Sequence, residues 1–230
     1  MCLIHKSGLI AWIGERNNQL FRHLRYQIAI SERRIFPMKI NRFGKAEILN
    51  PQEITLLFSE GLVKPRDRAL FGVCLYAAAR INESCTLQRG DIIGTRGIRP
   101  KLIIRAYNTK GGQDTREIQV HPKLKEFLEE YSIELKGRNP HLFPGRHGLG
   151  HIHKASADRI LREALRRVDL DERGMSSHSF RRTALTWMSD SGVPLRHIQS
   201  ISGHRSLAAL ERYLGVTEQQ KENAISTLVF

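Results

Sequence analysis

A short C-terminal stretch holds four side chains of the kinds that could together act on a phosphodiester. His178 and Arg181 stand three positions apart, a spacing that places both on one face of a helix. His204 follows a glycine, and Tyr213 comes nine residues after it. An arginine offers a planar, permanently charged fork that matches phosphate oxygens, and a phenol can attack phosphorus once its neighbours activate it. Taken singly, each residue is equally well explained by capping, packing or a solvated helix face.

A second group of charged residues lies about a hundred positions upstream. The run R-D-R-A-L-F-G-V-C-L-Y-A-A-A-R is apolar on most sides, which predicts a buried helix from Pro65 to near Arg80. A charge at the end of a buried helix needs a partner, and Glu83 is the candidate. From residue 87 short β-rich runs alternate with glycine and proline, which predicts a three-stranded antiparallel sheet. Lys110 lies in its last hairpin loop, T-K-G-G-Q-D.

Apolar residues at helical spacing predict that the rest of the chain is helical. Asn50-Pro51 is a helix start, and that helix should end at Gly61. The other predicted helices lie within 15–34, over 122–135, over 154–168 and from His178 onward, with Ser177 as the candidate cap of the last. The expected fold class is therefore mainly α with a small three-stranded antiparallel sheet (α+β).

The predicted organisation is a basic N-terminal arm, residues 1–49, followed by one domain, residues 50–230. The arm holds nine Lys and Arg against three acidic residues, and its one helix cannot bury its own apolar stripe. Hydrophobic residues make up 40% of the 230, enough for a sizeable core in the remainder.

The charge of the chain predicts a polyanionic partner. Lys and Arg number 37 against 23 Asp and Glu, a net charge of +14. Such an excess makes nucleic acid the expected partner, with a basic protein that binds no nucleic acid as the minority alternative. The three cysteines, Cys2, Cys74 and Cys85, show no close pairing and indicate a reducing compartment. With no signal-peptide pattern and no apolar run of membrane-spanning length, a cytoplasmic location and no membrane partner are expected.

Taken in order, these residues closely resemble a known family. An arginine after an apolar helix, a lysine at a hairpin turn, H-x-x-R, G-H and a tyrosine nine residues later are the pattern of the tyrosine recombinases, the phage integrase family. The resemblance covers roughly residues 46–220 and extends to L-N-P-Q-E-I-T-L-L-F, H-L-F-P-G-R and S-H-S-F-R-R-T-A-L-T-W-M. It implies the catalytic-domain fold of that family and site-specific recombination through a 3′-phosphotyrosyl intermediate, without metal, ATP or another cofactor.

The resemblance also implies a role for each residue. Tyr213 would attack the DNA phosphodiester, while Arg80 and Arg181 would clamp the non-bridging oxygens of the scissile phosphate. Lys110 would protonate the 5′-oxygen leaving group, although Lys101 is a competitor if the strands are misread. His178 would assist proton transfer at the tyrosine, and His204 would form a hydrogen bond to the phosphate. Glu83 would support the site.

The chain departs from the family pattern in several places. The family usually has a glycine shortly before its first arginine, where this chain has Ala78-Ala79. Its usual Leu-Gly-His is Ser202-Gly203-His204 here, and Arg182 stands where histidine is frequent. Most members carry a further N-terminal helical domain of about 100 residues, so we expect either a single-domain member or a shortened form whose arm partly replaces that domain. The resemblance further implies double-stranded DNA as the partner and a tetramer on two DNA duplexes, with residues 217–230 reaching a neighbour.

Two alternatives belong to other functional classes. The histidines at 141, 147, 151 and 153 suggest a zinc site, but their spacing is irregular and no cysteine is near, which favours a loop beside DNA. The helices around Gly192-Val193-Pro194 resemble a helix-turn-helix, as in a DNA-binding regulator that cleaves nothing. An inactive recombinase remnant that still binds DNA is the related third interpretation.

Overall fold

The computed structural model describes residues 46–108, 114–211, 213–214, 222 and 225–226. Lys110 and the helix predicted within 15–34 lie outside these residues, as does the predicted arm except for its last four residues. No helix among the described residues is long and apolar enough to cross a membrane.

The first helix begins where the sequence predicts. In α2 (Pro51–Leu56) the Asn50 side chain accepts a hydrogen bond from the Glu53 amide at 2.8 Å, and the Glu53 carboxylate accepts one from the Asn50 amide at 3.0 Å. This reciprocal capping satisfies two amides that the helix itself leaves without partners. The helix continues as a π-helical turn, η2 (Leu57–Gly61), and ends at the predicted glycine.

The buried helix ends earlier than predicted. Helix α3 (Pro65–Tyr76) stops four residues before Arg80, because Ala78 takes a left-handed backbone conformation with φ 46° that no helix accommodates. Arg80 instead precedes a short helix, α4 (Ile81–Cys85), in extended conformation. The prediction that Arg80 terminates the apolar helix is therefore wrong, although the apolar, buried character of that helix is confirmed.

The strands form two separate antiparallel pairs rather than one three-stranded sheet. The pairs are β1 (Ile93–Gly94) with β2 (Gly97–Ile98), and β3 (Lys101–Ile104) with β4 (Arg116–Gln119). A two-residue turn joins the strands of the first pair, and Gly97, directly after the turn, takes φ 100°. Pro100 has no amide to donate to a ladder, so the chain leaves the first pair before the second begins. The β3–β4 register places Ile104 opposite Arg116.

The C-terminal half is helical, as the periodicity predicts. Helices α5 (Pro122–Glu134) and α6 (Lys154–Arg167) match the predicted ranges closely. Helix α7 begins at Ser177, so Ser176 rather than Ser177 is its cap, and the Ser179 hydroxyl accepts from the Ser176 amide at 3.1 Å. The remaining elements are α7 (Ser177–Asp190), α8 (Leu195–Ser202), α9 (Leu207–Glu211), and the 3₁₀ turns η3 (Arg89–Asp91), η4 (Ala106–Asn108), η5 (Arg146–Gly148) and η6 (Asp171–Arg173).

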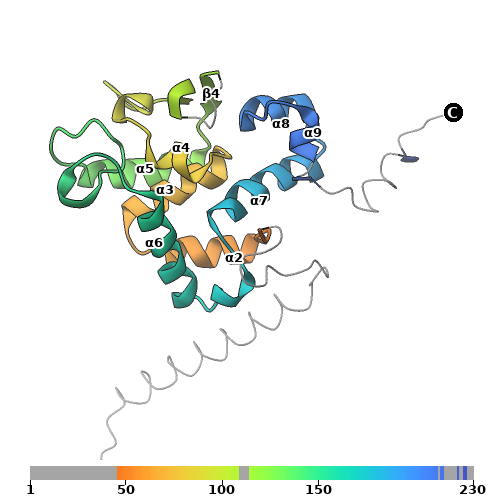
Figure 1. Ribbon diagram of the computed structural model, residues 1–230, viewed down its shortest axis with the longest axis horizontal. Helices are drawn as coiled ribbons and strands as arrows, with labels where there is room; N and C mark the ends of the chain where they lie inside the picture. The colour runs from red at the N-terminus through yellow and green to blue at the C-terminus, as the bar shows by residue number, and fades with distance from the viewer. Residues whose placement is uncertain (1–45, 109–113, 212, 215–221, 223–224, 227–230) are drawn as a thin grey trace, which may run out of the picture. The chain divides into compact units, whose positions relative to one another are not determined.

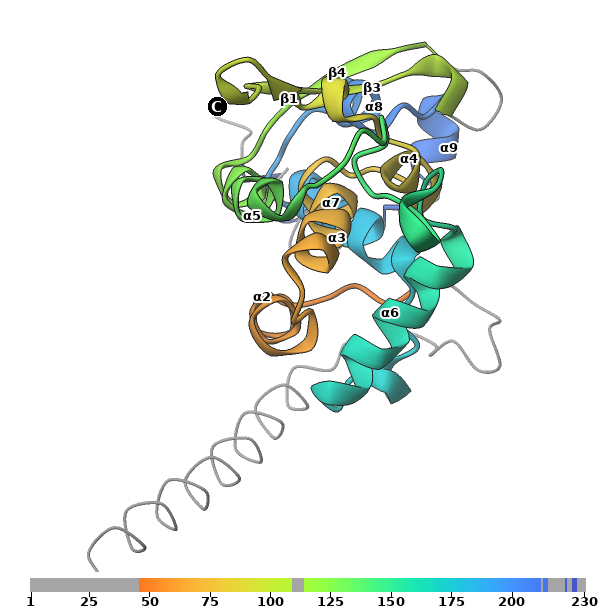
Figure 2. The same cartoon turned by 90° about the vertical axis from the view of Figure 1, so that its left-hand side faces the viewer.

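Helix α3 lies at the centre of the helical packing, with α5 and α7 against it (Figures 1 and 2). Aromatic rings join these helices, since Phe71 of α3 stacks on Phe180 of α7 at 5.3 Å between ring centroids. A second, smaller apolar cluster contains Ala78, Leu185, Ile198 and Leu210. This small apolar cluster joins the loop after α3 to helices α7, α8 and α9, and it supports the residues described next.

Candidate functional site

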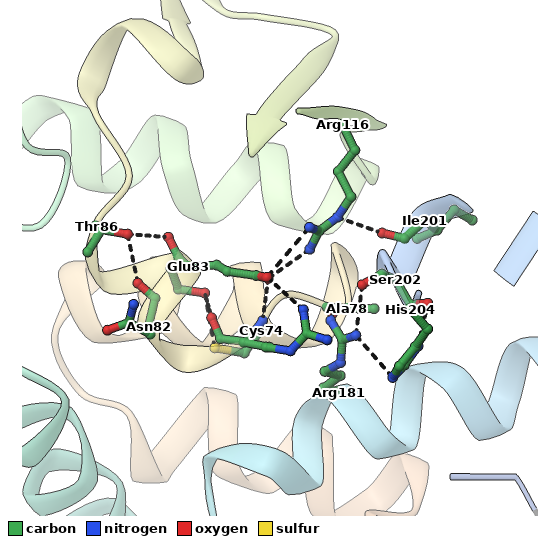
Figure 3. A network of polar contacts seen from close by, with 12 residues as sticks. Cys74, Ala78, Asn82, Glu83, Thr86, Arg116, Arg181, Ile201, Ser202 and His204 are labelled. Carbon is green, nitrogen blue, oxygen red and sulfur yellow. Dashed lines mark hydrogen bonds and ion pairs between the residues drawn. The ribbon is translucent and has the colours of Figure 1, made fainter. Parts of the chain in front are cut away.

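Arg181 is the residue around which the predicted site is built. It projects from α7 and is only 1% exposed, the largest fully buried side chain among the described residues. One terminal nitrogen, Nη1, donates to the Ala78 carbonyl, and the other, Nη2, donates to the Ser202 carbonyl at 2.7 Å (Figure 3). Nη2 also lies 3.4 Å from Nε2 of His204. Arg181 therefore joins the loop before Arg80 to the C-terminal end of α8.

The charge of Arg181 is poorly compensated inside the protein. The pKa of Arg181 is lowered to about 9, first by burial and then by the nearby Arg80 cation, against a smaller opposing effect of Glu83. A buried cation whose main partners are neutral carbonyls is stabilised by an anion brought beside it. The site thus has the electrostatic character of a receptor for negative charge.

Arg80 lies in the same cluster and is held by Glu83. The Glu83 carboxylate accepts from the Arg80 amide at 2.8 Å and from its Nη1 at 2.9 Å. Glu83 is 1% exposed, whereas the Arg80 side chain keeps 22% of its surface open. The carboxylate therefore fixes Arg80 from the interior while the guanidinium still reaches solvent. This confirms the Glu83–Arg80 pairing that the sequence suggested.

His204 is placed by the end of α8. Gly203 closes that helix in the left-handed conformation, φ 64°, and so turns His204 back toward Arg181. Its Nδ1 lies 2.8 Å from the Ser202 hydroxyl, and its carbonyl accepts from Gln199 Nε2 at 3.0 Å. Because a guanidinium can only donate, Nε2 is the acceptor toward Arg181, which leaves the ring proton on Nδ1.

The same surroundings keep the His204 ring neutral. Its pKa is lowered to about 4, first by burial and then by the charges of Arg181, Arg80 and Arg116, in that order. Near neutral pH the imidazole is therefore uncharged, because burial and the three nearby cations all oppose its protonation.

Tyr213 completes the cluster from the end of α9. Its ring centroid lies 5.0 Å from that of His204, with the planes inclined at 53°. The Tyr213 amide donates to the Leu210 carbonyl at 2.8 Å, and the ring packs against the small apolar cluster defined above. The phenol is thus half-buried and held beside a neutral imidazole, rather than displayed freely on the surface.

The structure brings five of the predicted residues together. Arg80, Glu83, Arg181, His204 and Tyr213 form one cluster from four separate stretches of the chain. His178 lies in the first turn of α7 with an exposed side chain, and Lys110 lies outside the described residues. The competitor Lys101 is exposed on β3, where it pairs with Glu117 at 2.9 Å.

Sequence reasoning missed one member of the cluster, Arg116. This first residue of β4 places Nη2 at 2.7 Å from the Glu83 carboxylate, and its Nε donates to the Ile201 carbonyl at 3.0 Å (Figure 3). Only 9% of the side chain is exposed. Both partners are distant in sequence, and an arginine on a short strand carries no local signal.

The histidine-rich loop does not form a metal centre in the part of the chain that the structure describes. The rings of His141, His151 and His153 follow one another at centroid distances of 5.3 and 5.6 Å. No group of three or more His, Cys, Asp or Glu side chains among the described residues is arranged to hold a metal ion.

Comparison with known proteins agrees with this geometry. Residues 48–220 match the phage integrase family. The chain belongs to that family. A tyrosine recombinase of Thermosipho africanus is 30% identical over 163 residues, which is 71% of this chain and 54% of the relative. A tyrosine recombinase of Pseudothermotoga lettingae is 29% identical over 185 residues, 80% of this chain and 61% of the relative. The chain thus spans little more than half the length of these family members.

Solved structures of recombinases share the fold. XerA recombinase superposes with a TM-score of 0.67 at 19% identity, over 82% of this chain and 68% of that one. The Tn1549 transposon integrase, solved in complex with a circular intermediate DNA, gives 0.66 at 13% identity, over 94% of this chain and 78% of that one. At these identities the likeness concerns the fold, which is mainly helical with small antiparallel sheets, as predicted.

Proposed function

We propose that the protein cleaves and rejoins DNA at specific sites through a covalent 3′-phosphotyrosyl intermediate at Tyr213. The observation that carries the proposal is the convergence of Arg80, Arg181, His204 and Tyr213 from separate elements onto one small region. Membership of the phage integrase family and the net charge of +14 support it.

In the proposed first step the Tyr213 oxygen forms a bond to phosphorus while the bond from phosphorus to the 5′-oxygen breaks. The phenolic proton leaves to a base, and the 5′-oxygen takes up a proton to become a hydroxyl. Attack of that hydroxyl, or of one from a second DNA strand, reverses the step and releases the tyrosine. The energy of the phosphodiester is conserved in the phosphotyrosyl bond, so we propose that rejoining requires no ATP.

The cluster supplies what phosphoryl transfer needs, which is positioning and positive charge. Arg80 and Arg181 would bind the non-bridging oxygens, and their two permanent charges would serve where other enzymes use a metal ion. A bound phosphate would offset the cations that lower the pKa of His204, so Nε2 could become a donor to the phosphate. Lys110 remains the proposed acid for the 5′-oxygen, and His178 the proposed aid to proton transfer. We also propose that the active assembly is a tetramer on two duplexes.

A randomised DNA substrate tests the proposal whatever the target sequence is. Nicked duplexes with a randomised central segment are incubated with the protein, and covalent adducts are resolved on a denaturing gel, then sequenced. We expect an adduct with enriched sequences for the wild type and none for Tyr213→Phe, which removes only the nucleophilic oxygen. Protease digestion leaves a short peptide on the DNA end that was joined to the protein, and this end stays blocked. We expect the blocked end to be the 3′ end of the captured strand.

Two outcomes would contradict the proposal. An adduct that persists in Tyr213→Phe would place the nucleophile elsewhere. A folded wild type that shifts DNA on a native gel but forms no adduct would favour a DNA-binding regulator or an inactive remnant.

A further inference from the structure

Each nitrogen of the Arg116 guanidinium contacts an acceptor of the protein. Nη2 and Nη1 lie 2.7 and 3.5 Å from the two oxygens of Glu83, and Nε donates to the Ile201 carbonyl at 3.0 Å. With its side chain only 9% exposed, Arg116 is oriented inward. Each of its three nitrogens has an acceptor, whereas Nε of Arg181 has none, so the geometry of Arg116 suits holding other groups better than clamping a phosphate.

Glu83 is shared between Arg116 and Arg80. Burial raises the pKa of this carboxyl, but the charge and hydrogen bonds of Arg116, with the Arg80 amide, outweigh burial and hold the pKa below its ordinary value. Glu83 therefore stays ionised inside the protein and orients the Arg80 side chain. Without Arg116, this buried carboxylate would lose its strongest stabilising partner.

The other end of Arg116 fixes the C-terminus of α8. The last carbonyls of a helix lack intrahelical partners and attract cations. Here two consecutive carbonyls are bound by two different arginines, Ile201 by Arg116 and Ser202 by Arg181. The chain then turns through Gly203 directly into His204, so both contacts lie within three residues of the imidazole.

Gly203 shows how closely Arg116 approaches this turn. A Cβ built on Gly203 would lie 2.9 Å from Arg116 Nη1 and 3.1 Å from its Cζ. The guanidinium is therefore packed onto the backbone of the turn itself, where only a glycine leaves room.

We infer that Arg116 is a positioning residue that locks Arg80, through Glu83, to the end of α8 and thereby to His204. This inference rests on the proposed function, because it assigns Arg80 and His204 to the same phosphate. Arg116 sets their relative position, so that one scissile phosphate meets both at once. Arg116 touches neither the phosphate nor the tyrosine in this assignment.

Variants of Arg116 test the inference with two independent readouts. The first is the titration of the His204 ring by NMR in DNA-free protein, assigned by comparison with His204→Gln. The second is the single-turnover rate of adduct formation at saturating DNA, measured beside the DNA dissociation constant. Glu117→Gln is the matched control, since Glu117 is the next residue on β4 and its side chain is 54% exposed.

For Arg116→Gln we expect adduct formation to slow by about 100-fold, the size of effect that a misplacement of about 1 Å produces. DNA affinity should stay within about twofold of wild type, and the His204 pKa should rise because a nearby cation has been removed. For Arg116→Lys we expect the His204 pKa to stay low while adduct formation remains slow, since a lysine keeps the charge but not the fork. The control should match wild type in both readouts.

Several results would overturn the inference. Wild-type cleavage by Arg116→Lys would show that charge alone suffices, and equal losses of affinity and rate in Arg116→Gln would indicate a DNA contact. If Arg116→Gln does not fold, Arg116→Lys decides the matter. If the wild type forms no adduct, the proposed function fails. The positioning role is refuted separately if a folded Arg116→Gln variant leaves the His204 pKa unchanged.

Discussion

Arg181 combines features that rarely coexist in one side chain. It is buried, charged and bound mainly to neutral carbonyls, and a second cation, Arg80, stands beside it. Such an arrangement is costly in the free protein, and the phosphate of the proposed function would offset that cost. Because Arg181 costs stability, we infer that function rather than stability explains why a buried arginine occupies this position.

Arg181→Lys separates charge from geometry. A lysine keeps the positive charge but replaces the planar fork with a single nitrogen, which cannot span the Ala78 and Ser202 carbonyls in the same way. We expect adduct formation to fall by roughly 100-fold or more, as when one transition-state donor is removed, while DNA binding is retained. Single-turnover cleavage and a native-gel titration measure the two effects. Near-normal cleavage would exclude the clamp role.

Ala78 explains one departure from the family pattern. The loop before Arg80 needs a left-handed residue, φ 46°, and alanine adopts it at a cost of about 1–2 kcal/mol that glycine does not incur. The neighbouring Ala79 is equally buried but has no positive φ, so it serves as the control. We expect Ala79→Gly to lower the free energy of unfolding by about 1–2 kcal/mol and Ala78→Gly to change it by less than about 1 kcal/mol. Urea unfolding of both variants checks this, and equal losses would contradict it.

The neutrality of His204 predicts how stability depends on pH. The ring has a pKa of about 4 in the folded protein and roughly 6.5 in the unfolded chain. Between these values only the unfolded chain binds the proton, so the free energy of unfolding decreases as the pH falls from about 6.5 to about 4. We expect His204→Gln to remove on the order of 3 kcal/mol of this pH dependence. Urea unfolding at a series of pH values provides the measurement, and identical pH profiles would show that the ring titrates normally.

At the level of elements, local sequence signals predicted most of the helices but not every residue at which a helix ends. The Asn50 cap and the helix ending at Gly61 followed from residues next to each other in the chain. The end of α3 did not, because a run of three alanines is typical of a helix and gives no sign of the left-handed φ that Ala78 adopts. Arg116 was invisible for a related reason, since its partners Glu83 and Ile201 are 33 and 85 positions away.

The turn at the end of α8 offers a test of how one element serves the site. Gly203→Ala would place a Cβ 2.9 Å from Arg116, in addition to the strain of a positive φ. Gly192 is a matched control because it also has a positive φ, 76°, but a Cβ there meets nothing within 4 Å. We expect both alanine variants to lose about 1–2 kcal/mol of stability, with slower adduct formation only for Gly203→Ala. Thermal unfolding and single-turnover cleavage are the measurements, and equal cleavage by the two variants would argue against a specific role for the turn.

At the scale of the whole molecule, the ordered pattern of residues predicted more than any local motif. The family and the fold followed from the order of Arg80, the H-x-x-R pair, the G-H pair and Tyr213 along the chain. The convergence of these residues depends on long-range packing around α3 and α7, which sequence patterns do not specify. Lys110 and most of the basic arm lie outside the described residues, so their roles remain predictions from the sequence.

The distribution of charge predicts how the arm contributes to DNA binding. Residues 1–49 carry nine cations and three acidic residues, a surplus of six within a total of +14. If the arm lies along DNA, its lysines and arginines release counterions, and each phosphate contact steepens the logarithmic salt dependence of binding by about 0.9. We expect the quadruple substitution of Arg33, Arg34, Lys39 and Arg42 by glutamine to flatten that slope by up to about 0.9 for each phosphate that the arm no longer neutralises. Fluorescence anisotropy with duplex DNA over a series of salt concentrations measures the slope.

A second quadruple variant distinguishes the arm from total charge. It carries the same charge change on exposed residues of α5 and the loop after it, at Lys123, Lys125, Lys136 and Arg138. Because counterion release counts only cations near phosphates, the arm variant should flatten the slope more than this one. Equal flattening by the two variants would mean that DNA binding depends on the net charge of the protein and not on where the cations lie. The arm would then have no specific role in binding the duplex.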